Sequence, residues 1–84
     1  MSNFLNLQRA INNGSIWLGE SSGGRAAADA LANGDCILGR EGHSDYYGGY
    51  VPSRTEVKSG TKGSASYARN IQGDRYARSI QRVK

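Results

Sequence analysis

The residues in this chain whose types could do chemistry together are Cys36, His43 and Asp45, which include its only cysteine and its only histidine. A cysteine beside a histidine can act as a nucleophile with its base. The same two residues fall short of the four ligands of a structural zinc site, unless carboxylates or a second chain complete the set. Cys36 lies in the apolar run 36–38, where cysteine is commonly a small buried side chain. The sequence therefore predicts no catalytic residue, no metal ion and no cofactor. A small enzyme that uses Cys36 and His43 is the third of three hypotheses.

A glycine-rich segment precedes a predicted helix and resembles a phosphate-binding loop in its spacing. Gly19, four residues and Gly24 match the glycines of that loop, but Arg25 and Ala26 replace its lysine and its magnesium-binding hydroxyl. Nucleotide hydrolysis is therefore not expected. The amides of Gly23, Gly24 and Arg25 form a candidate anion site, because a helix N-terminus favours negative charge. The alternative interpretation is a flexible loop that leads into the helix.

Positive charge is concentrated at the C-terminal end of the chain. Residues 1–50 hold three arginines against five acidic residues, a net charge of −2, and residues 51–84 hold eight basic against two acidic residues, a net charge of +6. The basic residues alternate with aromatic and aliphatic ones over 64–84, a composition typical of surfaces that bind acidic partners. The predicted partner-binding residues are Tyr67, Arg69, Ile71, Arg75, Tyr76, Arg78, Ile80 and Arg82.

This basic arm contains a short repeat, YARNIQ at 67–72 and YARSIQ at 76–81. Tyrosine and isoleucine are four residues apart in each copy, so each pair lies on one helical face. In an unbroken helix the nine-residue offset would place the two pairs on opposite sides, since it turns the helix by about 900°. Gly73 and Asp74 are the expected break, with Asp74 as the cap of a second short helix.

A longer repeat organises the N-terminal part, because AINNGSIWLG at 10–19 returns as ALANGDCILG at 30–39. Apolar positions predict a first helix that Ser2 caps, and alanines predict a second that Ser22 or Gly23 caps. Asn-Gly at 13–14 and 33–34 should end the two helices. The segments 16–18 and 36–38 are predicted to be extended and to lie side by side.

The segment 39–63 is predicted to be a loop, since it holds the only proline and shows no helical period. Brief strands are predicted at 50–51 and 55–57. Tyr46, Tyr47 and Tyr50 surround a glycine pair and form an aromatic patch. A structureless run of this length is uncommon within a compact domain, so it is expected to lie along another surface.

Only 14 of the 84 residues are Leu, Ile, Val or Phe, and 12 are glycine. Such a composition makes an independent core difficult to build. The predicted fold class is mainly α with long irregular segments: a head of two short helix–turn–strand units (1–38), a Gly/Ser/Tyr-rich segment (39–63) and a partly helical arm (64–84). We expect the chain not to be an independent compact globule.

The leading functional hypothesis is a non-enzymatic structural or linker subunit of a large assembly, such as a virion or another multi-subunit complex. Its arm would dock on acidic protein surfaces in a hetero- or homo-oligomer. The alternative is a small nucleic-acid-binding accessory protein that uses the arginines and tyrosines of the arm. A single cysteine and the lack of a signal-like or membrane-length apolar run favour an intracellular location without a membrane span.

Overall fold

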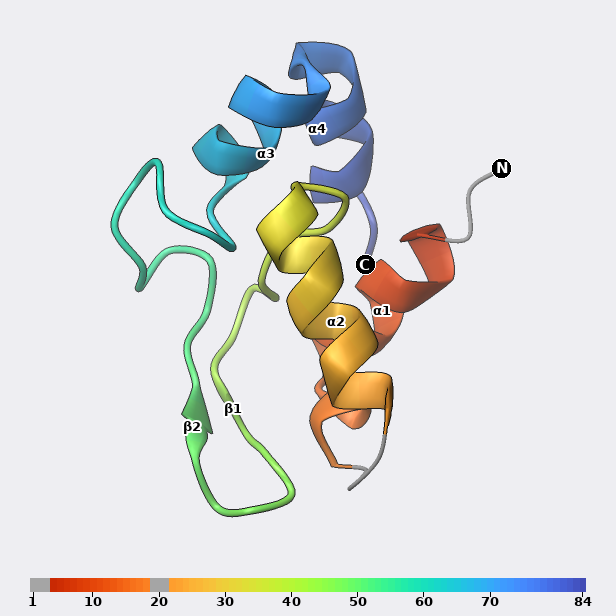
Figure 1. Cartoon of the computed structure of the whole chain (residues 1–84), viewed down its shortest axis with the longest axis vertical. Coiled ribbons are helices and arrows are strands. Elements are labelled where there is room, and N and C mark those ends of the chain that lie inside the picture. Colours follow the sequence, from red (N-terminus) through yellow and green to blue (C-terminus); the bar gives the residue numbers. More distant parts are fainter. Residues whose placement is uncertain (1–3, 19–21) are drawn as a thin grey trace.

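The computed structural model describes residues 4–18 and 22–84, and about half of the chain is helical. Four α-helices, a 3-10 helix and a two-stranded hairpin make up these residues (Figure 1). In chain order they are α1 (Phe4–Asn13), η1 (Ser15–Trp17), α2 (Ser22–Asn33), β1 (His43–Ser44), β2 (Tyr50–Val51), α3 (Ala65–Gln72) and α4 (Asp74–Gln81).

The first two helices end where the sequence predicts. Gly14 and Gly34, which follow the last residues of α1 and α2, have φ angles of 83° and 76°. Glycine adopts this left-handed conformation without the steric cost of a Cβ atom. Ser2, the predicted cap of α1, lies outside the described residues. Ser22 and Gly23, the predicted caps of α2, are the first two residues of that helix instead.

The two halves of the long repeat differ after these glycines. Residues 15–17 form η1 rather than the predicted extended segment, because local bonds hold the turn: the amide of Ser15 donates to the Asn13 side chain and that of Trp17 to the carbonyl of Gly14. The segment 36–38 forms neither a helix nor the predicted short strand, and it is bonded to distant parts of the chain. The two copies of the long repeat are therefore structurally equivalent only in their helices and in the glycines that follow them.

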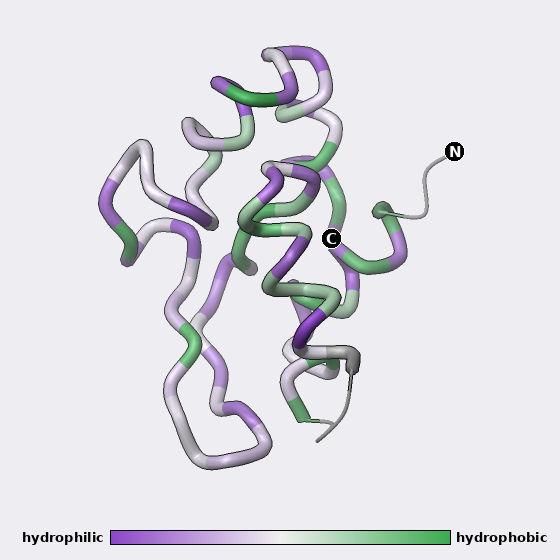
Figure 2. The backbone as a smooth tube through the Cα atoms, viewed as in Figure 1, coloured by the Kyte–Doolittle hydropathy of each residue, from purple (hydrophilic) through white to green (hydrophobic). Residues whose placement is uncertain are grey.

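The glycine-rich segment 39–63 folds into a hairpin and a series of turns. β1 and β2 pair antiparallel, with His43 opposite Val51. The Asp45 side chain accepts hydrogen bonds from the amides of Tyr47 and Gly49, which closes the hairpin turn. The strand predicted at 50–51 is confirmed, whereas 55–57 is a turn. Figure 2 shows that most of this segment is hydrophilic or near neutral and that the hydrophobic stretches lie in the helices and between α2 and the hairpin.

The arm forms two helices that pack against each other. Gly73 separates α3 from α4 with a φ of 97°, so the two copies of the short repeat occupy different helices. Asp74 is the first residue of α4 rather than its cap. Because the helix is broken, Ala68 and Ala77, at equal positions in the repeat, are both buried in one cluster.

The core consists of two clusters on either side of the segment 36–38. Cys36 is buried with residues of α1 and α2, whereas its neighbour Ile37 is buried with residues of α3 and α4. This short segment therefore connects both clusters. Gln8 of α1, which is fully buried, holds the segment in place: its Oε1 accepts the amide of Ile37 at 2.8 Å and its Nε2 donates to the carbonyl of Ile37 at 2.7 Å.

The radius of gyration is 11.5 Å. A compact domain of this length is expected to have a radius of about 12 Å. The structure therefore does not support the expectation of a non-compact chain. That expectation was based on a count of large aliphatic residues, which leaves out buried alanines. Alanines at positions 27, 30, 68 and 77 supply much of the buried apolar surface, and they let helices approach closely without large side chains.

Candidate protein-docking surface

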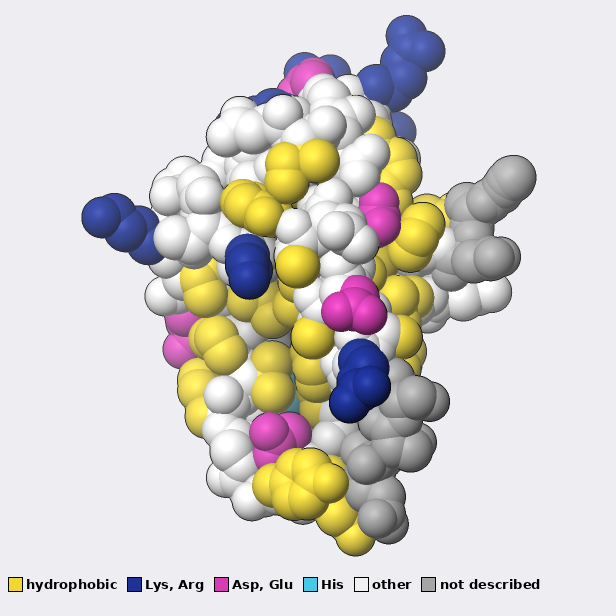
Figure 3. Space-filling view, viewed as in Figure 1, with side chains coloured by type: hydrophobic (Ala, Val, Ile, Leu, Met, Phe, Trp, Pro, Cys, Tyr) yellow, Lys and Arg dark blue, Asp and Glu magenta, His cyan; other side chains and the backbone are white. Residues whose placement is uncertain are grey.

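Three arginines lie along one face of α4, two within the helix and the third, Arg82, at its C-terminal cap. Arg75, Arg78 and Arg82 have the spacing i, i+3 and i+7, which places them on one side of the helix, and all three are exposed. They line a surface pocket of about 400 Å³ together with Asp74 and Ser79. Figure 3 shows basic side chains projecting from the part of the surface that α3 and α4 form. We call Arg75, Arg78 and Arg82 the arginine face of α4.

The arginine face is only partly neutralised within the chain. Nε of Arg78 lies 3.0 Å from Oδ2 of Asp74, and both side chains are more than half exposed. This is the only ion pair between described residues, so Arg75 and Arg82 have no carboxylate partner there. Exposed ion pairs of this kind contribute about 1 kcal/mol or less. The face therefore keeps a net positive charge that is available to acidic groups.

The opposite face of α4 fixes the helix on the rest of the chain. Ala77 and Ile80 are buried in the core, and the hydroxyl of Tyr76 donates to the carbonyl of Asp35, just after α2. In α3, the hydroxyl of Tyr67 donates to the carbonyl of Ala32 at 2.7 Å. The last carbonyls of a helix have no partner within it, so Tyr67 satisfies a group at the end of α2, while Tyr76 binds the residue two positions beyond the helix. The repeat thus holds both helices against α2.

The predicted partner-binding residues fall into two groups in the structure. The four arginines, at 69, 75, 78 and 82, are exposed. Tyr67 and Tyr76 are half-buried, and Ile80 is fully buried against the chain's own core. Ile71 is 50 % exposed beside Gly34 and is the most accessible of the apolar anchors. The arginines are therefore brought together at the surface, while most of the apolar positions serve the fold.

Cys36 and His43 do not meet. The thiol of Cys36 is 3.6 Å from the carbonyl oxygen of Phe4, and Nε2 of His43 is 3.1 Å from the carbonyl oxygen of Asn12. These two carbonyls are eight residues apart in α1, which corresponds to about 12 Å along the helix axis. The cysteine and the histidine thus contact opposite ends of α1, and they do not form a nucleophile–base pair.

Raising the pH from 9 to 12 is expected to destabilise the folded chain. Burial and the neighbouring charge of Asp35 raise the pKa of the Cys36 thiol to about 12. Burial and the charges of Cys36 and Asp35 raise the pKa of the Tyr76 hydroxyl to about 12. Because the folded state holds both protons more tightly than the unfolded chain, their contribution to stability is complete below the unfolded pKa values and is lost as the pH rises toward 12.

Urea titrations at a series of pH values measure this loss. The double variant Cys36→Ala/Tyr76→Phe, which lacks both groups, should lose less stability over the same interval than the natural chain. Equal losses in the two proteins would show that other groups cause the alkaline unfolding.

The candidate anion site lies at the start of α2. Gly23, Gly24 and Arg25 are in its first turn, and Arg25 is exposed. Residues 19–21, which lead into it, are outside the described residues, and the candidate anion site stays a prediction. Within the described ranges, no three His, Cys, Asp or Glu side chains are grouped so that they could hold a metal ion.

A polar network around the end of α1 was not expected from the sequence. Arg54 is half-buried, and its Nε and Nη2 donate to the carbonyl of Leu38 at 2.8 Å and to Oδ1 of Asn12 at 3.2 Å. Nδ2 of Asn12 donates to the carbonyl of Val83 at 2.8 Å. The sequence feature that could have indicated buried polar contacts of this helix is Gln8, a polar residue on its apolar face.

Comparison with protein-family models, curated proteins and solved structures found no match to this chain. In residues 4–18 and 22–84, no helix is both long enough and apolar enough to cross a membrane. The indication of function thus comes from the surface of the chain itself.

Proposed function

We propose that this chain is a non-enzymatic structural or linker subunit of a large assembly and that the arginine face of α4 docks on an acidic protein surface. The observation that carries the proposal is the exposure of Arg75 and Arg82 without a carboxylate partner among the described residues. The guanidinium group pairs with carboxylates through two parallel hydrogen bonds, and arginine is enriched at the energetic centres of protein interfaces.

The arginine face is attached to a folded scaffold, which favours docking. Ala77 and Ile80 hold α4 in the core, and the hydroxyls of Tyr67 and Tyr76 hold α3 and α4 to the end of α2. A partner would meet arginines whose backbone is already ordered. Binding then requires less loss of conformational freedom than the folding of an unstructured arm would.

A second candidate function is binding of single-stranded nucleic acid, which combines phosphate contacts with bases stacked on aromatic rings. The arginine face suits phosphates as well as carboxylates. However, Tyr67 and Tyr76 are engaged with the end of α2 through their hydroxyls. The exposed tyrosines of the hairpin, at 46, 47 and 50, belong to the end of the molecule opposite α3 and α4 (Figure 1). Arginines and accessible rings therefore do not share one surface, which favours protein docking.

Charge reversal on α4 tests the proposal. The tagged natural chain and the variant Arg75→Glu/Arg82→Glu are expressed in the native source and fractionated by mass after mild cross-linking, with and without nuclease. We expect the natural chain in a high-mass complex whose recovery does not change with nuclease. The variant should lose at least about tenfold of this recovery, because two repulsive charges then face an acidic partner.

The matched control is Arg9→Glu/Arg25→Glu, which makes the same change in net charge at exposed positions of α1 and α2. It should assemble as the natural chain does. Equal losses in both variants would show that only overall charge matters, and loss of the complex with nuclease would support the nucleic-acid alternative. A natural chain that sediments only as a monomer would contradict both functions.

A further inference from the structure

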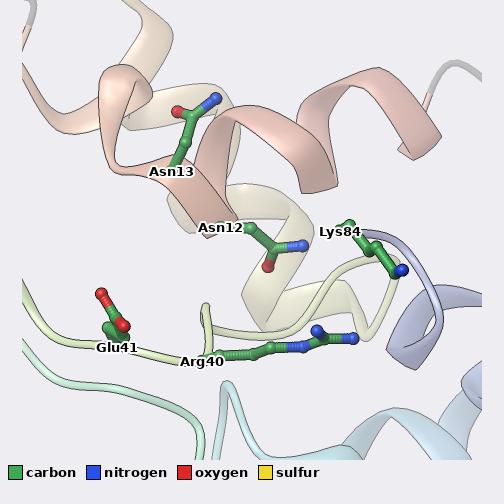
Figure 4. Close-up of a pocket in the computed structure, with 5 residues that line it drawn as sticks. All are labelled: Asn12, Asn13, Arg40, Glu41 and Lys84. Atoms are coloured by element: carbon green, nitrogen blue, oxygen red, sulfur yellow. The ribbon is translucent and has the colours of Figure 1, made fainter.

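Three cationic side chains gather at the C-terminal end of α1, away from the arginine face of α4. Two of them, Arg40 and Lys84, line a pocket of about 300 Å³, whose other lining residues are Asn12, Asn13 and Glu41. In Figure 4 the guanidinium of Arg40 and the ammonium of Lys84 lie on the same side of the pocket, beside the amide of Asn12. The third cation, Arg54, donates to Oδ1 of Asn12 at 3.2 Å. This cluster unites three segments that are far apart in the sequence.

Positive charge at this place exceeds the negative charge around it. The carboxylate of Glu41 points away from the guanidinium of Arg40 in Figure 4, and none of the three cations forms an ion pair with a described residue. Burial, and after it the charge of Arg40, lower the pKa of Arg54.

Helix ends explain part of this arrangement. Nη2 of Arg40 donates to the carbonyl of Gln81, the last residue of α4, and α1 ends at the pocket. Each helix C-terminus is equivalent to about half a negative charge, so two of them offset about one of the three cations. With the carboxylate of Glu41 counted as well, an excess of about one positive charge remains among these groups, and a bound anion would neutralise it.

We propose that this pocket binds a phosphate group, with Arg40 and Lys84 as its main ligands. Arginine presents paired N–H donors that match phosphate oxygens, and lysine adds a compact charge. The volume is at the small end of the range of ligand pockets, which suits inorganic phosphate or the phosphate of a small ester. The site does not depend on the proposed docking function, since none of the α4 arginines lines this pocket.

Titrations of the full chain with inorganic phosphate and with ribose 5-phosphate, at constant ionic strength, test the proposal. Amide NMR spectra should show saturable shifts centred on Asn12, Arg40 and Lys84, and calorimetry should fit one site. The variant Arg40→Gln/Lys84→Gln should bind at least about tenfold more weakly, as expected for loss of charged hydrogen-bond donors. Its circular dichroism reports whether it remains folded.

A control variant separates this site from other basic positions. Arg9→Gln/Lys62→Gln, which removes two charges at exposed positions outside the pocket, should bind phosphate as the natural chain does. If inorganic phosphate and ribose 5-phosphate bind equally tightly, the phosphate group alone is sufficient for binding. If ribose 5-phosphate binds more tightly, the ligand is a sugar phosphate. Both outcomes support the site. The proposal is overturned if the shifts do not saturate, if sodium chloride alone produces them, or if Arg40→Gln/Lys84→Gln binds normally.

Discussion

Replacement of Gln8 by Leu is expected to lower the free energy of unfolding by about 2–5 kcal/mol, because it leaves the buried amide and carbonyl of Ile37 without partners. A chain of this size has a total stability of about 4–13 kcal/mol. The variant should therefore be largely unfolded at modest urea concentrations. Urea titration followed by circular dichroism measures the change.

Gln72→Leu is the matched control, since the same side chain is exchanged at an exposed position. Gln72 donates to the carbonyl of Asn33 and to the Asp35 side chain, where water can replace it. Its loss should lower the free energy of unfolding by no more than about 1 kcal/mol. If the two variants were equally stable, the Gln8 side chain would not be what holds the segment 36–38 between the two clusters.

The second large effect is expected from Ile80→Ala, which should destabilise the chain by about 2–5 kcal/mol, because it removes a fully buried side chain and leaves a cavity. The repeat offers an internal comparison. Ile71 occupies the same position in the repeat but is 50 % exposed, so Ile71→Ala should lower the free energy of unfolding by about 1 kcal/mol or less. Thermal or urea unfolding of the two variants gives the difference directly.

Similar losses from Ile80→Ala and Ile71→Ala would indicate that α3 is buried as deeply as α4. If only Ile80→Ala loses its helical signal at a lower urea concentration, the result supports a buried Ile80 and an exposed Ile71. The comparison is informative because both variants remove the same atoms from the same six-residue pattern.

Local features of the fold were predictable from the sequence. Helix ends at Asn13 and Asn33 follow from glycines that accept positive φ angles, and the break at Gly73 follows from the same property. Helical spacing indicated the inner face of α1, and alternation indicated the strand at 50–51. Each of these depends on neighbours within a few residues.

Features that depend on distant parts of the chain were not predictable. Residues 15–17 form a 3-10 helix, whereas the segment 36–38 in the second copy of the repeat is neither helix nor strand and is bonded to Gln8 and to the carbonyl of Gly63. A count of large aliphatic residues also underestimated the core, since it omits buried alanines and the hydrogen bonds of a single glutamine.

The candidate docking surface was predictable in part. The sequence shows that arginines are concentrated in the arm, and the structure places Arg75, Arg78 and Arg82 on one side of α4. The role of the apolar residues in the arm was not predictable. Their spacing does not distinguish an isoleucine that contacts another protein from one that packs within its own chain. The pocket at Arg40 and Lys84 joins α1, the segment after α2 and the last residue, so only the tertiary structure shows it.

Hydrogen bonds from α1 to Ile37 and to Val83 join residues 29 and 71 positions apart. During synthesis on a ribosome, α1 would emerge long before the residues that complete its surroundings. The second core cluster requires Ile80, so α4 must leave the exit tunnel before that cluster can close. We therefore expect the nascent chain to acquire its protease resistance only after α4 has left the exit tunnel.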